Sequence, residues 1–498
     1  MAERQLQIVI LQRNRNSMTE TNIFRKNKIN LEDYDYQKDI QNRVLMSHFS
    51  PEDLEVLEEI VYSSQRIPIS RLVSQLDKSL DELQAILDKL SKTDLFKIEE
   101  DTVVVDKEMR KYFETQIQKF EDDFTPGMEF LQALLKKVPI HVLPNWYPIP
   151  RTSNNIFNSL IEKYLETPQT FQRYLSELNL GDPVLNGIIT DLFGAPGHKM
   201  YSDDIRKKYE LTEEVFEEHL LNLEFNLVCC LIYEKSGDEW VEVVTLFKEW
   251  KDYLNFLKES QPKEISEKEQ VNRTRPHDFS FAEDLSTILA LSMTKPLFAR
   301  LDQNEEWIFE KSAASQIAKQ CKGFDLKSEE GQALFNEYMA RALNKLLFLK
   351  LARIENNQLL PAEDAEEWLT LPIEKRALNT YKQTLSKYTF SEFPKEICTE
   401  RNIHEIEKSI GRIIGSGWVL FDEFLKGIIA PISENSKMSL KKTGRYWKYS
   451  LPDYSEEELA LIRKVIFNWL FEGGIIASGL FEGKDCLRIT PLGQSMFG

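Results

Sequence analysis

Apolar residues recur along this chain at helical spacing, and short alternating runs follow several of the helical stretches. Residues 455–497 show the pattern most clearly, with an amphipathic helix, an apolar strand, a Gly-Lys-Asp turn and a second strand. A 3.6-residue period followed by two strand-like runs around a turn predicts a helix and a β-hairpin. This is the end of a winged-helix unit, a small module of three helices and a hairpin wing.

Similar patterns occur upstream and predict tandem modules. Residues 50–125 give a first module, because Ser50-Pro51 opens a helix, Ser79 and Glu82 form a capping box, and a hairpin follows at 95–106. Residues 126–257 give a helical segment and then a second module, whose third helix is expected at 213–225. The expected fold is mainly α with small β-hairpins (α+β), built from tandem winged-helix domains.

The remaining boundaries come from composition. Residues 1–49 lack a clear period and predict a flexible lead with basic and acidic stretches. Residues 258–280 have almost no large apolar side chains and predict a linker. Residues 281–380 give a third module, and residues 381–498 give a C-terminal winged-helix-like module that contains a basic loop at 437–449.

Charge restricts the partners that the chain can bind. The 498 residues carry a formal net charge of −18, so contact with a phosphate backbone requires a locally basic patch. The expected third helix of the second module carries five glutamates and neither Lys nor Arg, which opposes DNA reading by that helix.

One stretch combines cations with aromatic rings and is the candidate nucleic-acid site. The predicted contact residues are Lys437, Lys441, Lys442, Arg445, Trp447 and Lys448. Tyr446 and Tyr449 lie among them, and no acidic residue interrupts the run. Lysine and arginine neutralise phosphates while aromatic rings stack on bases. The alternative interpretation is a solvated loop whose Trp447 packs on the core beneath the lysine stems.

The sequence offers no catalytic or metal-binding pattern. None of the six histidines lies at metal-ligand spacing from another histidine or from one of the five cysteines. Gly483-Lys484 lacks the other residues of a phosphate-binding loop. The adjacent Cys229 and Cys230 lie in an apolar run and are expected to be buried. We therefore expect neither an enzyme nor a cofactor.

Residues 283–497 resemble the accessory region of XPB-type DNA helicases and the bacterial proteins built around that region without the motor. The likeness lies in residues 289–320, in the wing at 349–360, in the Trp-Leu-x-Leu-Pro stretch within 357–383, and in the closing segment 467–497 with Thr490-Pro491-Leu492-Gly493. The resemblance implies a helicase-associated region and DNA transactions. The chain departs from a helicase because it carries no motor motifs.

Together these observations predict a non-enzymatic adaptor of winged-helix units in the cytoplasm. The expected partners are DNA and other proteins, with no membrane, because no apolar run approaches the roughly 20 residues that cross a bilayer. The alternative function is a protein–protein interaction scaffold with acidic docking faces and no nucleic-acid binding.

Overall fold

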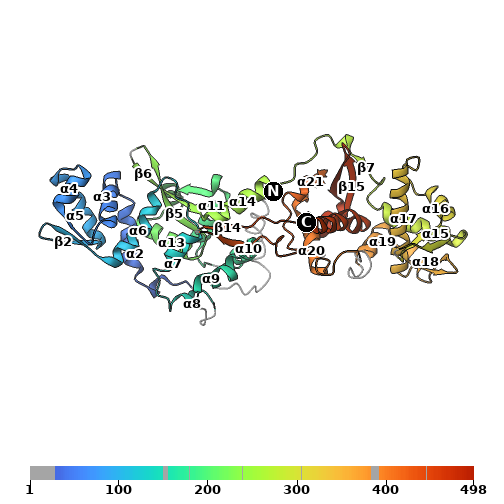
Figure 1. Ribbon diagram of the computed structural model, residues 1–498, viewed down its shortest axis with the longest axis horizontal. Coiled ribbons are helices and arrows are strands. Elements are labelled where there is room, and N and C mark those ends of the chain that lie inside the picture. Colours follow the sequence, from blue (N-terminus) through green and yellow to red (C-terminus); the bar gives the residue numbers. More distant parts are fainter. Residues whose placement is uncertain are drawn as a thin grey trace. The chain divides into compact units, whose positions relative to one another are not determined.

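The computed structural model describes residues 29–149, 155–178, 180–237, 239–303, 305–382, 392–444 and 446–498 (Figure 1). The chain divides into two compact units. The N-terminal unit holds the residues up to Phe256 and the segment Ser439–Ser450, and the C-terminal unit holds Leu257–Met438 and Leu451–Gly498. Both combine helices with small antiparallel sheets, so the expected α+β class is confirmed.

The first module alternates helices and strands around a small sheet. In chain order its main elements are α3 (Pro51–Tyr62), β1 (Arg66–Pro68), α4 (Ile69–Leu76), α5 (Leu80–Leu90), β2 (Phe96–Glu99) and β3 (Thr102–Val105). Strand β3 lies between β1 and β2. Ser50 and Ser79 cap α3 and α5 in capping boxes, which confirms the predicted starts of both helices.

The second module repeats this order of elements. It consists of α11 (Pro183–Gly194), β4 (Lys199–Tyr201), α12 (Ser202–Tyr209), α13 (Glu213–Phe225), β5 (Cys229–Ser236) and β6 (Glu239–Leu246). Strand β6 lies between β4 and β5. Cys229 and Cys230 are fully buried on β5, as the apolar run predicted.

Further helices complete the N-terminal unit. They are α6 (Lys107–Ile117), α7 (Met128–Leu135), α8 (Leu143–Trp146), α9 (Ile156–Leu160), α10 (Pro168–Glu177) and, after β6, α14 (Lys248–Glu259). A hairpin of β13 (Leu440–Thr443) and β14 (Tyr446–Tyr449) also belongs to this unit.

The structure contains a helix in the described part of the stretch 1–49, which was expected to be a flexible lead. Residues 36–46 form α2 (Tyr36–Met46), a helix with buried charged side chains as well as buried apolar ones. Arg43 is 1% exposed and Asp39 is 6% exposed. The ion-pair partners of both side chains lie far away in the sequence, so a pattern based on apolar spacing could not identify this helix. The first 28 residues of the predicted lead lie outside the described residues.

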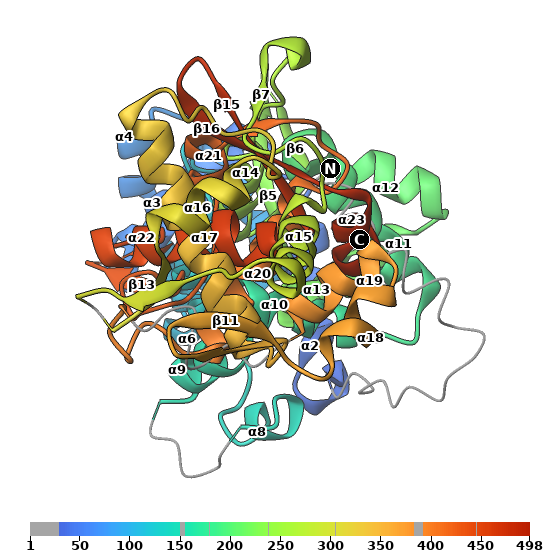
Figure 2. The same cartoon turned by 90° about the vertical axis from the view of Figure 1, so that its right-hand side faces the viewer.

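The C-terminal unit begins with the third module. Its elements are α15 (Ser280–Thr294), β8 (Ala299–Leu301), β9 (Trp307–Phe309), α16 (Lys311–Ala318), α17 (Glu329–Phe348), β10 (Ala352–Glu355), β11 (Gln358–Pro361), α18 (Ala365–Thr370) and α19 (Ile373–Tyr381). Helices α15, α16 and α17 lie side by side (Figures 1 and 2). Their facing side chains Leu285, Ile317 and Leu343 are fully buried in one apolar core.

The last module closes the chain. It contains α20 (Glu400–Ser409), β12 (Val419–Leu420), α21 (Phe421–Leu425), α22 (Glu456–Lys464), β15 (Ile476–Phe481), β16 (Lys484–Ile489) and α23 (Pro491–Phe497). Helix α22, strands β15 and β16 and the turn between them match the helix and hairpin predicted from the sequence.

The predicted linker at 258–280 packs along the C-terminal unit. Its residues Asn272 and Arg273 form β7, which extends the sheet of the last module in the order β12-β16-β15-β7. Ile265 donates its N–H to the carbonyl oxygen of Trp418 at 2.7 Å, and the buried Arg275 pairs with Asp284. Backbone pairing fixes this segment, and such pairing needs few large apolar side chains.

Candidate nucleic-acid interface

The predicted basic loop is a β-hairpin. Strands β13 and β14 are antiparallel and pair Leu440 with Tyr449, Lys441 with Lys448, Lys442 with Trp447, and Thr443 with Tyr446. Partners in an antiparallel pair project from the same face, and successive pairs alternate between the faces. The hairpin therefore has an inner face with Leu440 and Trp447 and an outer face with Lys441 and Tyr446.

Backbone and inner-face side-chain contacts fasten the hairpin to the N-terminal unit. The N–H of Leu440 donates to the carbonyl oxygen of Glu166 at 2.7 Å, and the Tyr449 hydroxyl donates to the carbonyl oxygen of Leu165 at 2.8 Å. The N–H of Trp447 donates to Glu129 Oε1 at 2.6 Å. Leu440 and Tyr449 are buried. These contacts tie both strands to their own unit and hold the hairpin in one orientation.

Aromatic contacts complete this anchor. The Tyr449 ring lies 5.6 Å from that of Trp250, measured between centroids, and the half-buried Trp447 lies 6.0 Å from Phe157 in an edge-to-face arrangement. Trp447 thus makes the contacts expected of a packing residue, which was the alternative interpretation of its role.

The hairpin carries exposed positive charge, two of its three lysines lying on the outer face. Lys441, Lys442 and Lys448 are exposed. Within the described part of the chain, no carboxylate oxygen lies within 4.0 Å of the ammonium group of any of the three. Lys442 shares the register of the inner face, but its side chain remains in solvent.

Two predicted contact residues do not lie on the described hairpin. Lys437 precedes it, belongs to the C-terminal unit and is half-buried. Arg445 lies outside the described residues.

The structure adds two residues that the prediction omitted. Tyr446 is 66% exposed on the outer face and is the aromatic side chain of the hairpin most open to solvent. The ammonium group of Lys248, at the start of α14, lies 5.8 Å from the centroid of the Tyr446 ring. The exposed Lys248 was missed because it lies far upstream in the sequence, and no local pattern links it to the hairpin.

The third helix of every module begins with acidic side chains. These first-turn residues are Asp81 and Glu82 on α5, Glu213 and Glu214 on α13, Glu329 and Glu330 on α17, and Glu456, Glu457 and Glu458 on α22. Negative charge at a helix N-terminus is stabilised by the helix dipole. The same charge repels phosphates where a recognition helix would insert into a groove.

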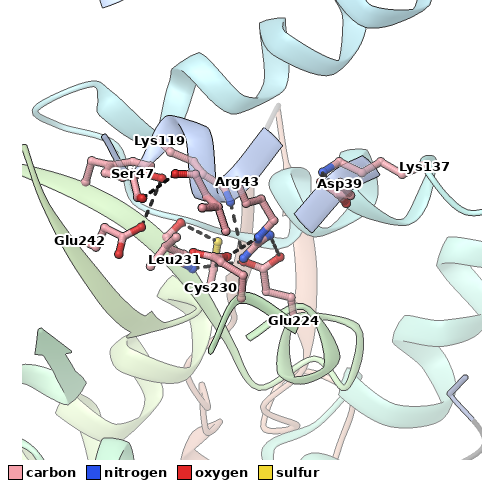
Figure 3. Close-up of polar contacts among 12 residues, drawn as sticks. Asp39, Arg43, Ser47, Lys119, Lys137, Glu224, Cys230, Leu231 and Glu242 are labelled. Carbon is pink, nitrogen blue, oxygen red and sulfur yellow. Dashed lines mark hydrogen bonds and ion pairs between the residues drawn. The ribbon is translucent and has the colours of Figure 1, made fainter. Parts of the chain in front are cut away.

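A buried ion network underlies the N-terminal unit (Figure 3). Arg43 on α2 donates from Nε to Glu217 Oε2 at 2.5 Å, and from Nη1 and Nη2 to the two oxygens of Glu224 at 2.9 and 3.1 Å. Lys119 Nζ lies 3.7 Å from Glu224 Oε1. Burial alone raises the pKa of Glu224, but Arg43 and then Lys119 outweigh it and lower this pKa to about 2. The network joins α2 to α13 and fills a structural role.

Asp39 makes a second buried link from α2. Its carboxylate accepts from the Tyr112 hydroxyl at 2.7 Å and pairs with Lys137 at 3.3 Å. Burial opposes ionisation of Asp39, yet Lys137 and Arg43 hold its pKa below the usual value. Neither link could be predicted from the sequence, because Arg43 and Asp39 pair with residues far away along the chain.

One titratable group lies near Tyr449 of the hairpin. Glu249 on α14 is 2% exposed and accepts the N–H of Met128 through Oε1 at 3.0 Å. Burial, and to a smaller extent the nearby Glu129, raise the pKa of Glu249 to about 7. This carboxyl is therefore partly protonated at neutral pH.

The described residues contain no group of three or more His, Cys, Asp or Glu side chains placed to hold a metal ion. Burial raises the thiol pKa of Cys229, Cys230 and Cys321, which disfavours the reactive thiolate. None of the described helices combines the length and apolar character needed to cross a bilayer.

Comparison with known proteins supplied no relative: no protein-family model, no curated protein and no solved structure matches this chain.

Proposed function

We propose that this protein is a non-enzymatic adaptor of tandem winged-helix units that contacts nucleic acid through the hairpin 440–449. One observation carries the proposal. Three exposed lysines, Lys441, Lys442 and Lys448, lie on a hairpin whose inner face is anchored, without a carboxylate at ion-pair distance among the described residues.

The order of elements supports the winged-helix assignment. Helix, strand, two helices and two strands recur in the first, second and last modules, and the first strand of each pairs with the last: β1 with β3, β4 with β6, and β12 with β16. In the third module the hairpin β8–β9 takes the place of the single first strand. The resemblance to the accessory region of XPB-type helicases agrees with a role beside DNA and remains a prediction, as does the cytoplasmic location.

Local charge favours the hairpin despite the net charge of −18. Exposed charges farther away than about 8–10 Å are largely screened at physiological salt, so a phosphate close to the hairpin is affected mainly by its lysines. The anchored strands hold these lysines in place, so less conformational entropy is lost on binding. The acidic first turns of the third helices disfavour insertion of these helices into a DNA groove.

Charge reversal tests the proposal. The full chain with Lys441, Lys442 and Lys448 changed to Glu is titrated against fluorescently labelled 30-mer oligonucleotides at 50 mM salt, single-stranded and duplex, with anisotropy as the readout. We expect the affinity to fall roughly tenfold to a hundredfold, since the variant loses three phosphate contacts and gains repulsion.

A matched control uses three exposed lysines of the C-terminal unit, Lys319, Lys322 and Lys327. Changing these to Glu alters the net charge equally but leaves the hairpin intact. The control variant should bind within about twofold of the wild type. An equal loss in both variants, or wild-type protein that binds no oligonucleotide, contradicts the proposal.

The acidic first turns favour one second candidate, a scaffold that docks basic proteins. Asp81, Glu214 and Glu456 illustrate the exposed carboxylates that such a partner would meet on three separate modules. In that case the protein binds a basic polypeptide in a salt-dependent way, and charge reversal in the hairpin leaves this binding unchanged.

A further inference from the structure

We propose that the outer face of the hairpin is a platform for single-stranded nucleic acid, with Tyr446 as the side chain that stacks on a base. This inference rests on the proposed function and specifies the ligand of the same site. It assigns the stacking role to Tyr446 in place of Trp447.

The three aromatic residues of the hairpin differ in accessibility. Tyr449 is 4% exposed, and its hydroxyl donates to the carbonyl oxygen of Leu165. Trp447 is half-buried against Phe157. Tyr446 is 66% exposed on the opposite face. A base can reach Tyr446 without disturbing the anchor of the hairpin, whereas stacking on Trp447 would require that anchor to open.

Three lysines lie near the Tyr446 ring, where they could contact phosphates. Lys441 and Lys448 are directly opposed partners on the same face. They lie two residues from the Thr443–Tyr446 pair, which is about 7 Å along the strand. Lys248 Nζ lies 5.8 Å from the ring centroid and adds a third cation near the ring. A base on Tyr446 would thus have lysines within reach of the phosphates that flank it.

The combination of one open ring with nearby cations distinguishes single strands from duplexes. Stacking on a side chain requires an unpaired base whose face is exposed, and a duplex keeps its base faces stacked within the helix. Duplex reading through the grooves would instead use the third helices, and each of these begins with at least two acidic residues. The ring and lysines therefore favour an unpaired strand.

Removal of the Tyr446 ring tests this inference. Tyr446→Ala and the conservative Tyr446→Phe are compared with the wild type by anisotropy on a single-stranded 20-mer and on the same sequence as a duplex, at 50 mM salt. We expect Tyr446→Ala to weaken single-strand binding roughly fivefold to a hundredfold, the range that loss of one stacked base produces. Tyr446→Phe should bind like the wild type, and duplex binding should change by less than about twofold in both variants.

The outcomes separate the inference from the proposed function. If Tyr446→Ala binds the single strand normally while reversal of the hairpin lysines abolishes binding, stacking is refuted and the phosphate contact stands. Equal weakening on single strand and duplex also refutes stacking. If the wild type binds neither oligonucleotide, the proposed function fails and the inference fails with it.

Discussion

Arg43 offers the sharpest test of how the N-terminal unit is held together. Its guanidinium is 1% exposed and makes three hydrogen bonds to Glu217 and Glu224, which are 2% and 0% exposed. Arg43→Met keeps an unbranched apolar stem but leaves these carboxylates without their main cation. Lys119 remains 3.7 Å from Glu224 and compensates in part.

Breaking one side of a buried ion pair costs about 3–5 kcal/mol, because a buried charge is left uncompensated. A tenfold change in an equilibrium constant corresponds to about 1.4 kcal/mol, so this cost equals roughly a 10²- to 4 × 10³-fold increase in local opening. The effect should concentrate on α2 and α13, whose side chains form the network. The chain has two units, so a single global unfolding midpoint is not a suitable readout.

Hydrogen exchange with mass spectrometry measures opening segment by segment. Peptides that cover α2 and α13 should exchange faster by that factor in Arg43→Met, while peptides from α17 in the C-terminal unit serve as the internal reference. Arg66→Met is the matched control, because Arg66 pairs with Glu99 at 3.3 Å on the surface, where ion pairs contribute about 0–1 kcal/mol. If Arg43→Met changes α2 no more than Arg66→Met does, the network does not stabilise this helix.

Two further predictions concern single residues of each unit. At pH 8.5 the amides of α14 should exchange more slowly in Glu249→Gln than in the wild type, and near pH 4.5 the two proteins should exchange alike. The raised pKa of about 7 means that the stability contributed by the Glu249 carboxyl is complete below about pH 4.5 and is lost as the pH rises through 7. A pH-independent difference in exchange would contradict this assignment. Gly493→Ala should destabilise the last module by about 1–3 kcal/mol, since an added Cβ would lie 2.2 Å from the carbonyl oxygen of Ile475. Gly411→Ala, where a Cβ meets no atom within 4 Å, should be neutral in the same hydrogen-exchange experiment, and equal effects of the two changes would refute the steric argument.

Local sequence patterns predicted much of the secondary structure. The capping residues Ser50 and Ser79 mark helix starts that the structure contains, and the closing helix and hairpin follow their apolar spacing. Such signals are short-range, because a helix period or a cap involves residues within a few positions of one another.

Long-range contacts account for what the sequence could not predict. Arg43 is buried because its partners Glu217 and Glu224 lie far away in the chain, so α2 appeared to be part of a polar lead. The basic stretch was found by composition. Which of its aromatic rings are buried depends on contacts with Phe157, Leu165 and Trp250 in another part of the sequence. Only the pairing register shows that Tyr446 shares a face with Lys441.

The salt dependence of single-strand binding measures phosphate contacts at the hairpin most directly. The slope of log affinity against log salt is about −0.7 per phosphate contact on a single strand. Neutralising Lys441, Lys442 and Lys448 to Gln should therefore make the slope shallower by about 2 relative to the wild type. Parallel slopes for the two proteins would show that these lysines do not contact phosphates, and would contradict the account.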